Sequence, residues 1–236
     1  PDEEIGRGAD EFDVDGFAAD YAYTVDGGEL GGVEYETFNA AAATVTVKGL
    51  SIHPGAAKNK LINASQVAME FHAMLPVHER PESTEGYEGF SMLRDIHSDI
   101  EQAVMNYIIR DHDDEKFEQK KDRFYQIAVY LDSIYGEGTV EVEMKDSYYN
   151  MRRQIEPVMY IVDRAKAAME RLGITPYSVP VRGGTDGARL SYMGLPCPNL
   201  CTGGMNFHGR YEYAVVEEME SCARILVEIL TAPELG

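Results

Sequence analysis

The sequence has 236 residues, of which 44% are hydrophobic and 26% charged, a composition typical of a folded globular protein. Its 41 acidic and 21 basic residues give a formal net charge of −20. Such a charge repels phosphate backbones and anionic lipid, so we expect neither nucleic acid nor a membrane surface as a partner. The three cysteines have no CxxC spacing, which favours a reducing compartment, the cytoplasm, over a disulfide framework.

The chain opens on the segment PDEEIGRGAD. This segment has neither the basic region nor the apolar region of a signal peptide, and we expect it to come from the middle of a longer protein. A β-rich run at residues 18–25 then meets Asp26-Gly27-Gly28, a pattern that predicts a strand running into a turn.

The next part of the chain alternates between the periodicities of strands and helices. Six elements are predicted in the order β-α-β-β-α-β: residues 38–48, 61–75, 89–96, 103–111, 117–134 and 139–144. This order is that of the ferredoxin-like sandwich, in which two helices cover one face of a four-stranded sheet. We expect this sandwich to occupy residues 35–146.

The remaining residues return to an α/β pattern. Apolar residues at helical spacing predict one helix from Ile155 to Leu172, with Gly173 ending it. Two glycine turns follow, RGGTDG and TGGMNFHG, and Asp186 in the first is predicted to be the N-cap of a helix. A last amphipathic helix is expected at residues 215–229.

The layout predicts an α/β protein in which a small domain is inserted into a larger one. The larger domain consists of residues 1–34 and 147–236, and the inserted domain of residues 35–146.

Four residues with acidic or imidazole side chains stand out as candidates for chemistry. The neighbours Glu3 and Glu4 point opposite ways on extended backbone, so one can bind a metal while the other acts as a base, although an acidic surface turn is the alternative. Asp26 ends a strand, where ligands bind in α/β sheets, but Asp-Gly is also an ordinary turn. His208 lies in a glycine loop and suits a ligand or a catalyst. Such oxygen and nitrogen donors, without a partner cysteine, indicate zinc or a similar ion.

Six segments in this order extend the argument: PDEEIGRGAD, YTVDGGELGG, GLSIHPGAAKN, YIIRDHD, RGGTDGARLSYMGLPCPNL and TGGMNFHGRYEY. Together they resemble the tripeptide aminopeptidases, the peptidase T group of the zinc-dependent M20 metallopeptidases, from Pro1 to the last helix. The resemblance implies part of a zinc-peptidase α/β catalytic domain, truncated at its N-terminus. It also implies that the inserted ferredoxin-like (βαββαβ) domain is a lid and dimerisation domain of a homodimer.

The resemblance implies roles for the residues that match. Glu3 resembles the general base that activates water. Glu4 and His208 resemble ligands of one zinc ion, and Asp26 resembles a ligand of the second.

Three further residues resemble groups that hold the substrate. His53, on the lid, resembles the histidine that steadies the oxyanion or the substrate carboxylate. Arg110 and Arg182 resemble groups that bind the substrate's C-terminal carboxylate, a task suited to a bidentate guanidinium. The alternatives are an ordinary loop residue for His53, and an ion pair of Arg110 with Asp111 or Asp113.

The resemblance also implies a His-x-Asp motif and a bridging Asp upstream of Glu3, where this sequence begins. The run His97-Ser98-Asp99 has the spacing of that motif but lies on the expected lid, so it does not replace it. One zinc ion would keep Glu4 and His208, and the other only Asp26, fewer than the three protein ligands typical of catalytic zinc. We therefore expect the parent protein to remove the N-terminal residue from small peptide substrates, tripeptides, with two zinc ions. We expect this chain alone to bind zinc weakly and to hydrolyse nothing.

Two alternatives stay open. The parent could be another M20-type metallohydrolase, a dipeptidase, carboxypeptidase or aminoacylase. The chain could instead be a dimerising lid module without catalysis.

Overall fold

The computed structural model describes residues 8–232, so the predicted site residues Glu3 and Glu4 lie outside the described part of the chain. The chain divides into two compact units: unit 1 is Pro1–Phe38 with Tyr149–Gly236, and unit 2 is Asn39–Tyr148. The predicted domain boundaries lie a few residues before these divisions. Among the helices of residues 8–232, none has both the length and the apolar character that a membrane span requires.

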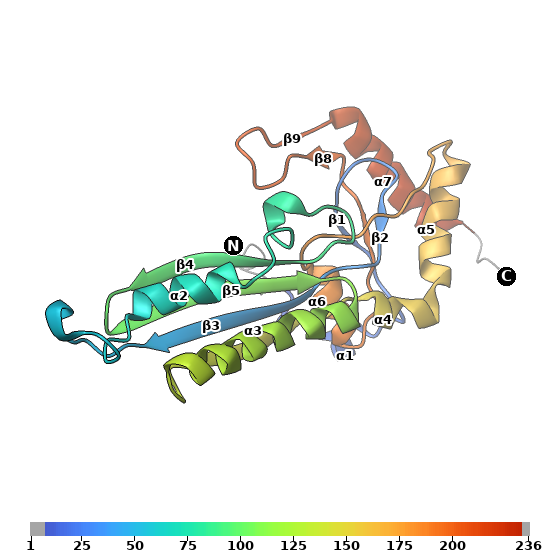
Figure 1. The fold of residues 1–236 in the computed structure, drawn as a ribbon. Helices are drawn as coiled ribbons and strands as arrows, with labels where there is room; N and C mark the ends of the chain where they lie inside the picture. Colours follow the sequence, from blue (N-terminus) through green and yellow to red (C-terminus); the bar gives the residue numbers. More distant parts are fainter. Residues whose placement is uncertain (1–7, 233–236) are drawn as a thin grey trace. The chain divides into compact units, whose positions relative to one another are not determined.

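Unit 2 is a four-stranded antiparallel sheet with two long helices (Figure 1). In chain order it contains β3 (Asn39–Lys48), η2 (Pro54–Ala56), α2 (Ala64–Ala73), η3 (Pro81–Ser83), β4 (Phe90–Ser98), β5 (Gln102–Asp111), α3 (Asp114–Tyr135) and β6 (Val140–Tyr148). The sheet order is β4-β5-β3-β6. The predicted β-α-β-β-α-β sandwich is therefore confirmed.

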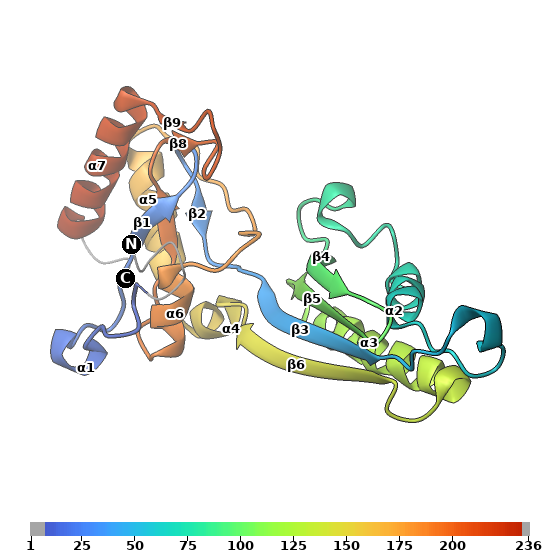
Figure 2. The same cartoon turned by 90° about the vertical axis from the view of Figure 1, so that its left-hand side faces the viewer.

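The core of unit 2 lies between the sheet and its helices. Alternate residues of β3 and β5 are buried, as the period of two in a strand requires. The rings of Phe71 on α2, Tyr107 on β5 and Phe124 on α3 lie within 6.4 Å of one another, centroid to centroid. Figures 1 and 2 show both helices along the same face of the sheet. Each of these buried rings stabilises the sandwich by roughly 1.5–3 kcal/mol.

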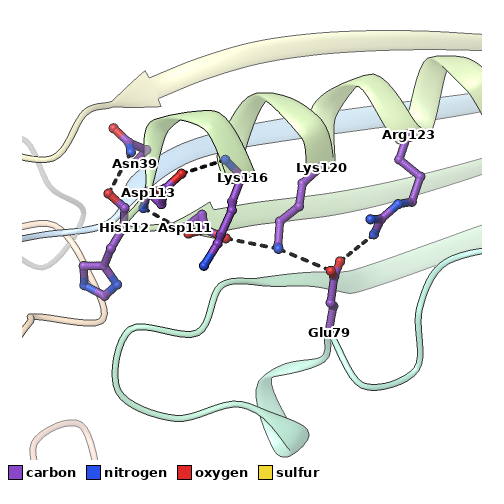
Figure 3. A network of polar contacts seen from close by, with 8 residues as sticks. All are labelled: Asn39, Glu79, Asp111, His112, Asp113, Lys116, Lys120 and Arg123. Atoms are coloured by element: carbon purple, nitrogen blue, oxygen red, sulfur yellow. Dashed lines mark hydrogen bonds and ion pairs between the residues drawn. The ribbon is translucent and has the colours of Figure 1, made fainter.

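A network of ion pairs joins α3 to the segment that follows α2 (Figure 3). The ammonium of Lys120 lies 3.1 Å from Asp111 Oδ2 and 3.5 Å from Glu79 Oε1, and Arg123 Nη1 lies 2.6 Å from Glu79 Oε2. The side chains of Lys120 and Asp111 are only 7% and 1% exposed. Since a buried charge is costly without a partner, these groups depend on one another.

Unit 1 contains a small sheet flanked by helices. In chain order its elements are α1 (Val14–Phe17), β1 (Thr24–Gly27), β2 (Val33–Glu34), α4 (Arg152–Ile155), η4 (Glu156–Val158), α5 (Tyr160–Arg171), α6 (Asp186–Tyr192), β7 (Asn199–Cys201), β8 (Gly204–Met205), β9 (Tyr213–Ala214) and α7 (Val216–Thr231). The sheet order is β1-β7-β2, with β1 and β7 parallel. Figure 2 shows α5 and α7 side by side, and Arg164 on α5 donates to the carbonyl oxygen of Ile229 on α7 at 2.9 Å. The last predicted helix is confirmed as α7.

The predicted strand at residues 18–25 begins later than expected. Strand β1 starts at Thr24, and Ala18 instead has a left-handed conformation (φ 51°) at the end of α1. In the preceding segment, Ala22 N donates to Pro196 O at 2.9 Å, and the Tyr23 hydroxyl donates to the carbonyl oxygen of Ile161 at 2.6 Å. Residues 18–23 therefore lie outside the strand, although the backbone of Ala22 bonds to the segment before β7.

The predicted helix from Ile155 to Leu172 is interrupted. Helix α4 ends at Ile155, a 3₁₀ turn follows, and α5 begins at Tyr160. Pro157 explains the break, because its ring has no N–H and clashes with the preceding turn of an α-helix. The predicted stop is confirmed: Gly173 has φ 76°, and the N–H that follows it, on Ile174, donates to Met169 O at 2.9 Å.

The prediction that Asp186 is an N-cap is wrong by one residue. Thr185 has extended backbone, and its hydroxyl accepts from the Ala188 N–H at 3.0 Å. Asp186 is the first helical residue, where the helix dipole favours a carboxylate.

Candidate functional site

The carboxyl ends of β1 and β7 lie side by side and bring Asp26 to the edge of the small sheet. The register pairs Val25 with Leu200 and Gly27 with Cys201, and Asp26 falls at the irregularity between them. Bulges of this kind redirect a side chain next to many active sites. The Asp26 side chain is exposed, at the strand end where the sequence placed it.

Hydrogen bonds join the Asp26 turn to the loop that follows β7. The Thr202 hydroxyl donates to Gly27 O at 2.7 Å, and the N–H groups of Thr202 and Gly203 both donate to Gly28 O at 3.1 Å. Gly203 has φ 78°, and a Cβ there would lie 2.7 Å from the Cβ of Glu218. Only glycine fits this close approach to α7, which therefore lies directly against the loop after β7.

His208 lies in the loop of the hairpin formed by β8 and β9. His208 and Asn206 have left-handed backbones, with φ of 56° and 58°, a conformation that needs support for residues other than glycine. That support comes from Glu212, whose Oε2 accepts from His208 N at 3.0 Å, and from Asn206 Nδ2, which donates to Tyr211 O at 3.2 Å. The imidazole of His208 is exposed. Asp26 and His208 thus occupy two segments of unit 1 that hydrogen bonds connect.

Glu34 is a further carboxyl group at this sheet edge that the sequence reasoning missed. Its Oε2 accepts from Asn199 Nδ2 at 3.3 Å, and a Cβ on Gly27 would lie 3.2 Å from the same oxygen. Burial raises the pKa of Glu34 and the charge of Asp26 adds to that, while hydrogen bonds from Asn199 and Gly28 lower it. The alternation of residues 33–36 (VEYE) predicts a strand, but it does not show which side chains lie beside the Glu34 carboxyl group.

The donor types at this edge suit zinc, which binds carboxylate oxygen and imidazole nitrogen. Their number does not make a complete site, because within residues 8–232 no three His, Cys, Asp or Glu side chains gather closely enough to hold an ion. The described residues therefore include the donor atoms that zinc prefers, but they do not form a complete set of ligands.

Arg182 lies in unit 1 on a segment paired with residues 36–38. Val181 N donates to Glu36 O at 2.9 Å, and Phe38 N donates to Gly183 O at 3.3 Å. The guanidinium carbon of Arg182 lies 5.1 Å from the centre of the Phe38 ring. This cation–π contact orients the Arg182 side chain over the Phe38 ring.

His53 and Arg110 both belong to unit 2. His53 is exposed and caps the turn η2, where its Nδ1 accepts from Gly55 N at 3.1 Å. Arg110 Nη1 donates to the carbonyl oxygens of Ala41 and Ile109 at 3.1 and 2.9 Å, and its guanidinium carbon lies 5.4 Å from the Tyr148 ring. These contacts replace the alternative of a simple ion pair with a neighbouring aspartate.

Residues 35–138 match the M20 peptidase dimerisation domain. The chain is 55% identical over 230 residues to peptidase T of Alkaliphilus oremlandii, covering 98% of this chain and 56% of that protein. The chain therefore spans little more than half the length of this curated relative.

Two solved structures share the fold. The aminopeptidase PepT of Bacillus cereus superposes with a TM-score of 0.82 at 23% identity, covering 97% of this chain and 61% of that one. The YXEP protein of Bacillus subtilis, described as a dinuclear metal-binding peptidase of the M20 family, gives 0.70 at 16% identity, with 97% and 62% covered. Likeness at these identities establishes the mixed α/β fold that the sequence predicts.

Proposed function

We propose that the parent protein is a tripeptide aminopeptidase, because this chain is homologous to peptidase T along almost its whole length. The observation that carries the proposal is the 55% identity over 230 residues to a curated peptidase T. The proposed reaction is hydrolysis of the first peptide bond of a tripeptide, which releases the N-terminal residue.

The proposal includes two zinc ions, with Glu4 and His208 as ligands of one and Asp26 as a ligand of the other. Its support is the exposed carboxylate and imidazole on hydrogen-bonded segments, together with a structural neighbour described as dinuclear. Bound zinc polarises a carbonyl group and lowers the pKa of water.

The chain's own residues would bind the peptide and move the proton. Glu3 takes a proton from the attacking water and returns it to the leaving amine. His53 would steady the oxyanion or the substrate carboxylate, and Arg110 and Arg182 would bind the C-terminal carboxylate. For both arginines, the aromatic contact at 5.4 or 5.1 Å limits the positions of the guanidinium, so less freedom is lost on binding.

The same proposal covers assembly and compartment. Unit 2 would pair with a second copy of the chain, since its residues match a dimerisation domain. The protein would act in the cytoplasm, where the three buried, unbridged cysteines remain reduced.

The test is the length dependence of hydrolysis by the longest protein that the gene encodes. We expect the kcat/KM for trialanine to exceed that for dialanine and tetra-alanine by roughly tenfold or more, because a displaced carboxylate loses charged hydrogen bonds worth ~1.5–3 kcal/mol. A preference for dipeptides, for C-terminal cleavage or for acyl-amino acids would replace the proposal with another M20-type activity. A stable dimer without any hydrolysis would favour the non-catalytic module.

A further inference from the structure

Unit 1 has a hollow of about 480 Å³ beside the loop that carries His208. Its lining comes from the hairpin and from the start of α7: Thr202, Gly204, Phe207, Glu212, Tyr213, Ala214 and Met219. Ligand sites commonly measure ~300–1,000 Å³, so the hollow has room for part of a small molecule.

The walls of the hollow are apolar and open to solvent. Phe207, Tyr213 and Met219 are 48%, 50% and 50% exposed. The core of the unit does not require these side chains, because α7 packs against the core through Cys222, Ile225 and Ile229 instead. Large apolar groups that gather at the surface in this way mark a place where another apolar group binds.

The walls are also held in place. A Cβ on Gly204 would clash with Cζ and Cε1 of Phe207, so the tip of this ring lies directly against the bare backbone of β8. The Tyr213 hydroxyl contacts Met205 Sδ at 2.7 Å, across the β8–β9 pair. Contacts that fix the walls before binding reduce the entropy lost when a ligand enters.

Glu212 supplies the one carboxyl group among the seven lining residues. Its Oε2 accepts from the backbone N–H of His208, so this carboxylate contacts both the hollow and the loop of the proposed zinc ligand. A carboxylate attracts an ammonium group and repels another carboxylate. The hollow therefore suits the amine end of a peptide, whereas the arginines suit the carboxylate end.

We propose that this hollow is the subsite for the N-terminal residue of the peptide, with an apolar side chain against Phe207, Tyr213 and Met219 and the α-ammonium beside Glu212. This inference rests on the proposed aminopeptidase function and adds a selectivity for the first residue of the peptide. The substrates that it favours are tripeptides with a medium-sized apolar first residue.

The kinetic test compares Leu-Gly-Gly with Gly-Gly-Gly in the longest protein that the gene encodes. The wild type should favour Leu-Gly-Gly by roughly tenfold or more in kcat/KM, and Met219→Ala should lower that ratio by about fivefold, because lost methylene contacts weaken selection. Val227→Ala changes an exposed residue of the same helix outside the hollow and should leave the ratio unchanged. An unchanged ratio in Met219→Ala overturns the proposal.

A binding measurement separates this inference from the activity. Leucinamide should shift the NMR signal of the Met219 methyl group, identified by its loss in Met219→Leu, whereas glycinamide and N-acetyl-leucinamide should shift it much less. If no tripeptide is hydrolysed but leucinamide gives this shift, the aminopeptidase proposal fails and the hollow remains a site for apolar amines. If tripeptides are hydrolysed and the Met219 signal does not respond, the inference about the hollow is wrong.

Discussion

The hydroxyl of Thr202 donates to the carbonyl oxygen of Gly27 at 2.7 Å and accepts from the N–H of Gly204 at 3.0 Å. One side chain therefore connects the turn after Asp26 to the base of the His208 hairpin. The two proposed metal ligands, Asp26 and His208, are 182 positions apart in the sequence (208 minus 26). The Thr202 side chain, together with the N–H groups of Thr202 and Gly203 that donate to Gly28 O, joins their segments.

The first prediction concerns this link. Thr202→Val keeps the shape of the side chain and removes both hydrogen bonds, which leaves a carbonyl oxygen and an N–H short of a partner. We expect the free energy of unfolding to fall by about 1–3 kcal/mol in a urea titration. Thr231→Val removes an exposed hydroxyl at the end of α7 and should cost less than about 0.5 kcal/mol. Equal effects of the two changes would argue against the link.

The second prediction concerns the ion network of Figure 3. Lys120→Met removes a cation that faces the buried Asp111 and the partly buried Glu79. The free energy of unfolding should fall by about 3–5 kcal/mol, because a carboxylate is left in the interior without its partner. Thermal or urea unfolding measures this loss.

The control for Lys120→Met lies on the same helix. Lys116 is exposed, and only its backbone N–H joins the network, through Asp113 Oδ1 at 2.9 Å. Lys116→Met should therefore change stability by less than about 0.5 kcal/mol. The double change Lys120→Met with Asp111→Asn should recover part of the loss, and no recovery would contradict the assignment of the cost to an unpaired Asp111.

The third prediction separates the two candidates for the cap of α6. Thr185→Ala should cost about 1 kcal/mol of stability, since the side chain accepts from Ala188 N. Asp186→Ala removes only a favourable charge in the first turn, worth about 0.3–1 kcal/mol and weakened by salt. Urea titrations at low and high salt distinguish them. A salt-independent loss that is larger for Asp186 would restore the cap predicted from sequence.

The fourth prediction is a loss of stability in alkali. Burial raises the pKa of Cys197 from 9.0 to about 11 and that of Cys222 from 9.0 to about 12. The unfolded chain therefore releases these protons at lower pH than the folded chain, so stability is full below about pH 9 and falls as pH rises toward 11–12. Unfolding free energies measured from pH 8 upward should show this decline.

Cys197→Ala provides the matched comparison for the alkaline decline. The variant has its own packing cost at every pH, but its stability should fall less steeply above pH 9, by up to ~1.4 kcal/mol per pH unit for one proton. Identical slopes in the variant and the wild type would show that Cys197 does not titrate in this way.

The fold of unit 2 could be predicted from sequence because its signals are local. Strands β3, β5 and β6 alternate with a period of two, and each long helix repeats apolar residues at helical spacing, as in the buried side chains of Phe117, Phe124 and Leu131 on α3. The errors lie in unit 1. The aromatic residues at 18–23 have β propensity, but β1 begins only at Thr24, and Pro157 breaks a periodicity that is otherwise continuous.

The site was predictable only in part. Asp26 at a strand end and His208 in a glycine loop have local signals. The link through Thr202 and the partners of Glu34 depend on the pairing of β1, β2 and β7, three segments far apart in the chain. No local pattern specifies such pairs, because a hydroxyl or carboxyl group bonds equally well to many partners.

The most direct test of the account is the zinc content of the longest protein that the gene encodes, measured by elemental analysis after dialysis, for the wild type, His208→Ala and Arg210→Ala. The account predicts two zinc ions per chain in the wild type and in Arg210→Ala, a neighbour in the same exposed loop, and a loss of zinc together with tripeptide hydrolysis in His208→Ala. Retention of both zinc ions and full tripeptide hydrolysis by His208→Ala would contradict it.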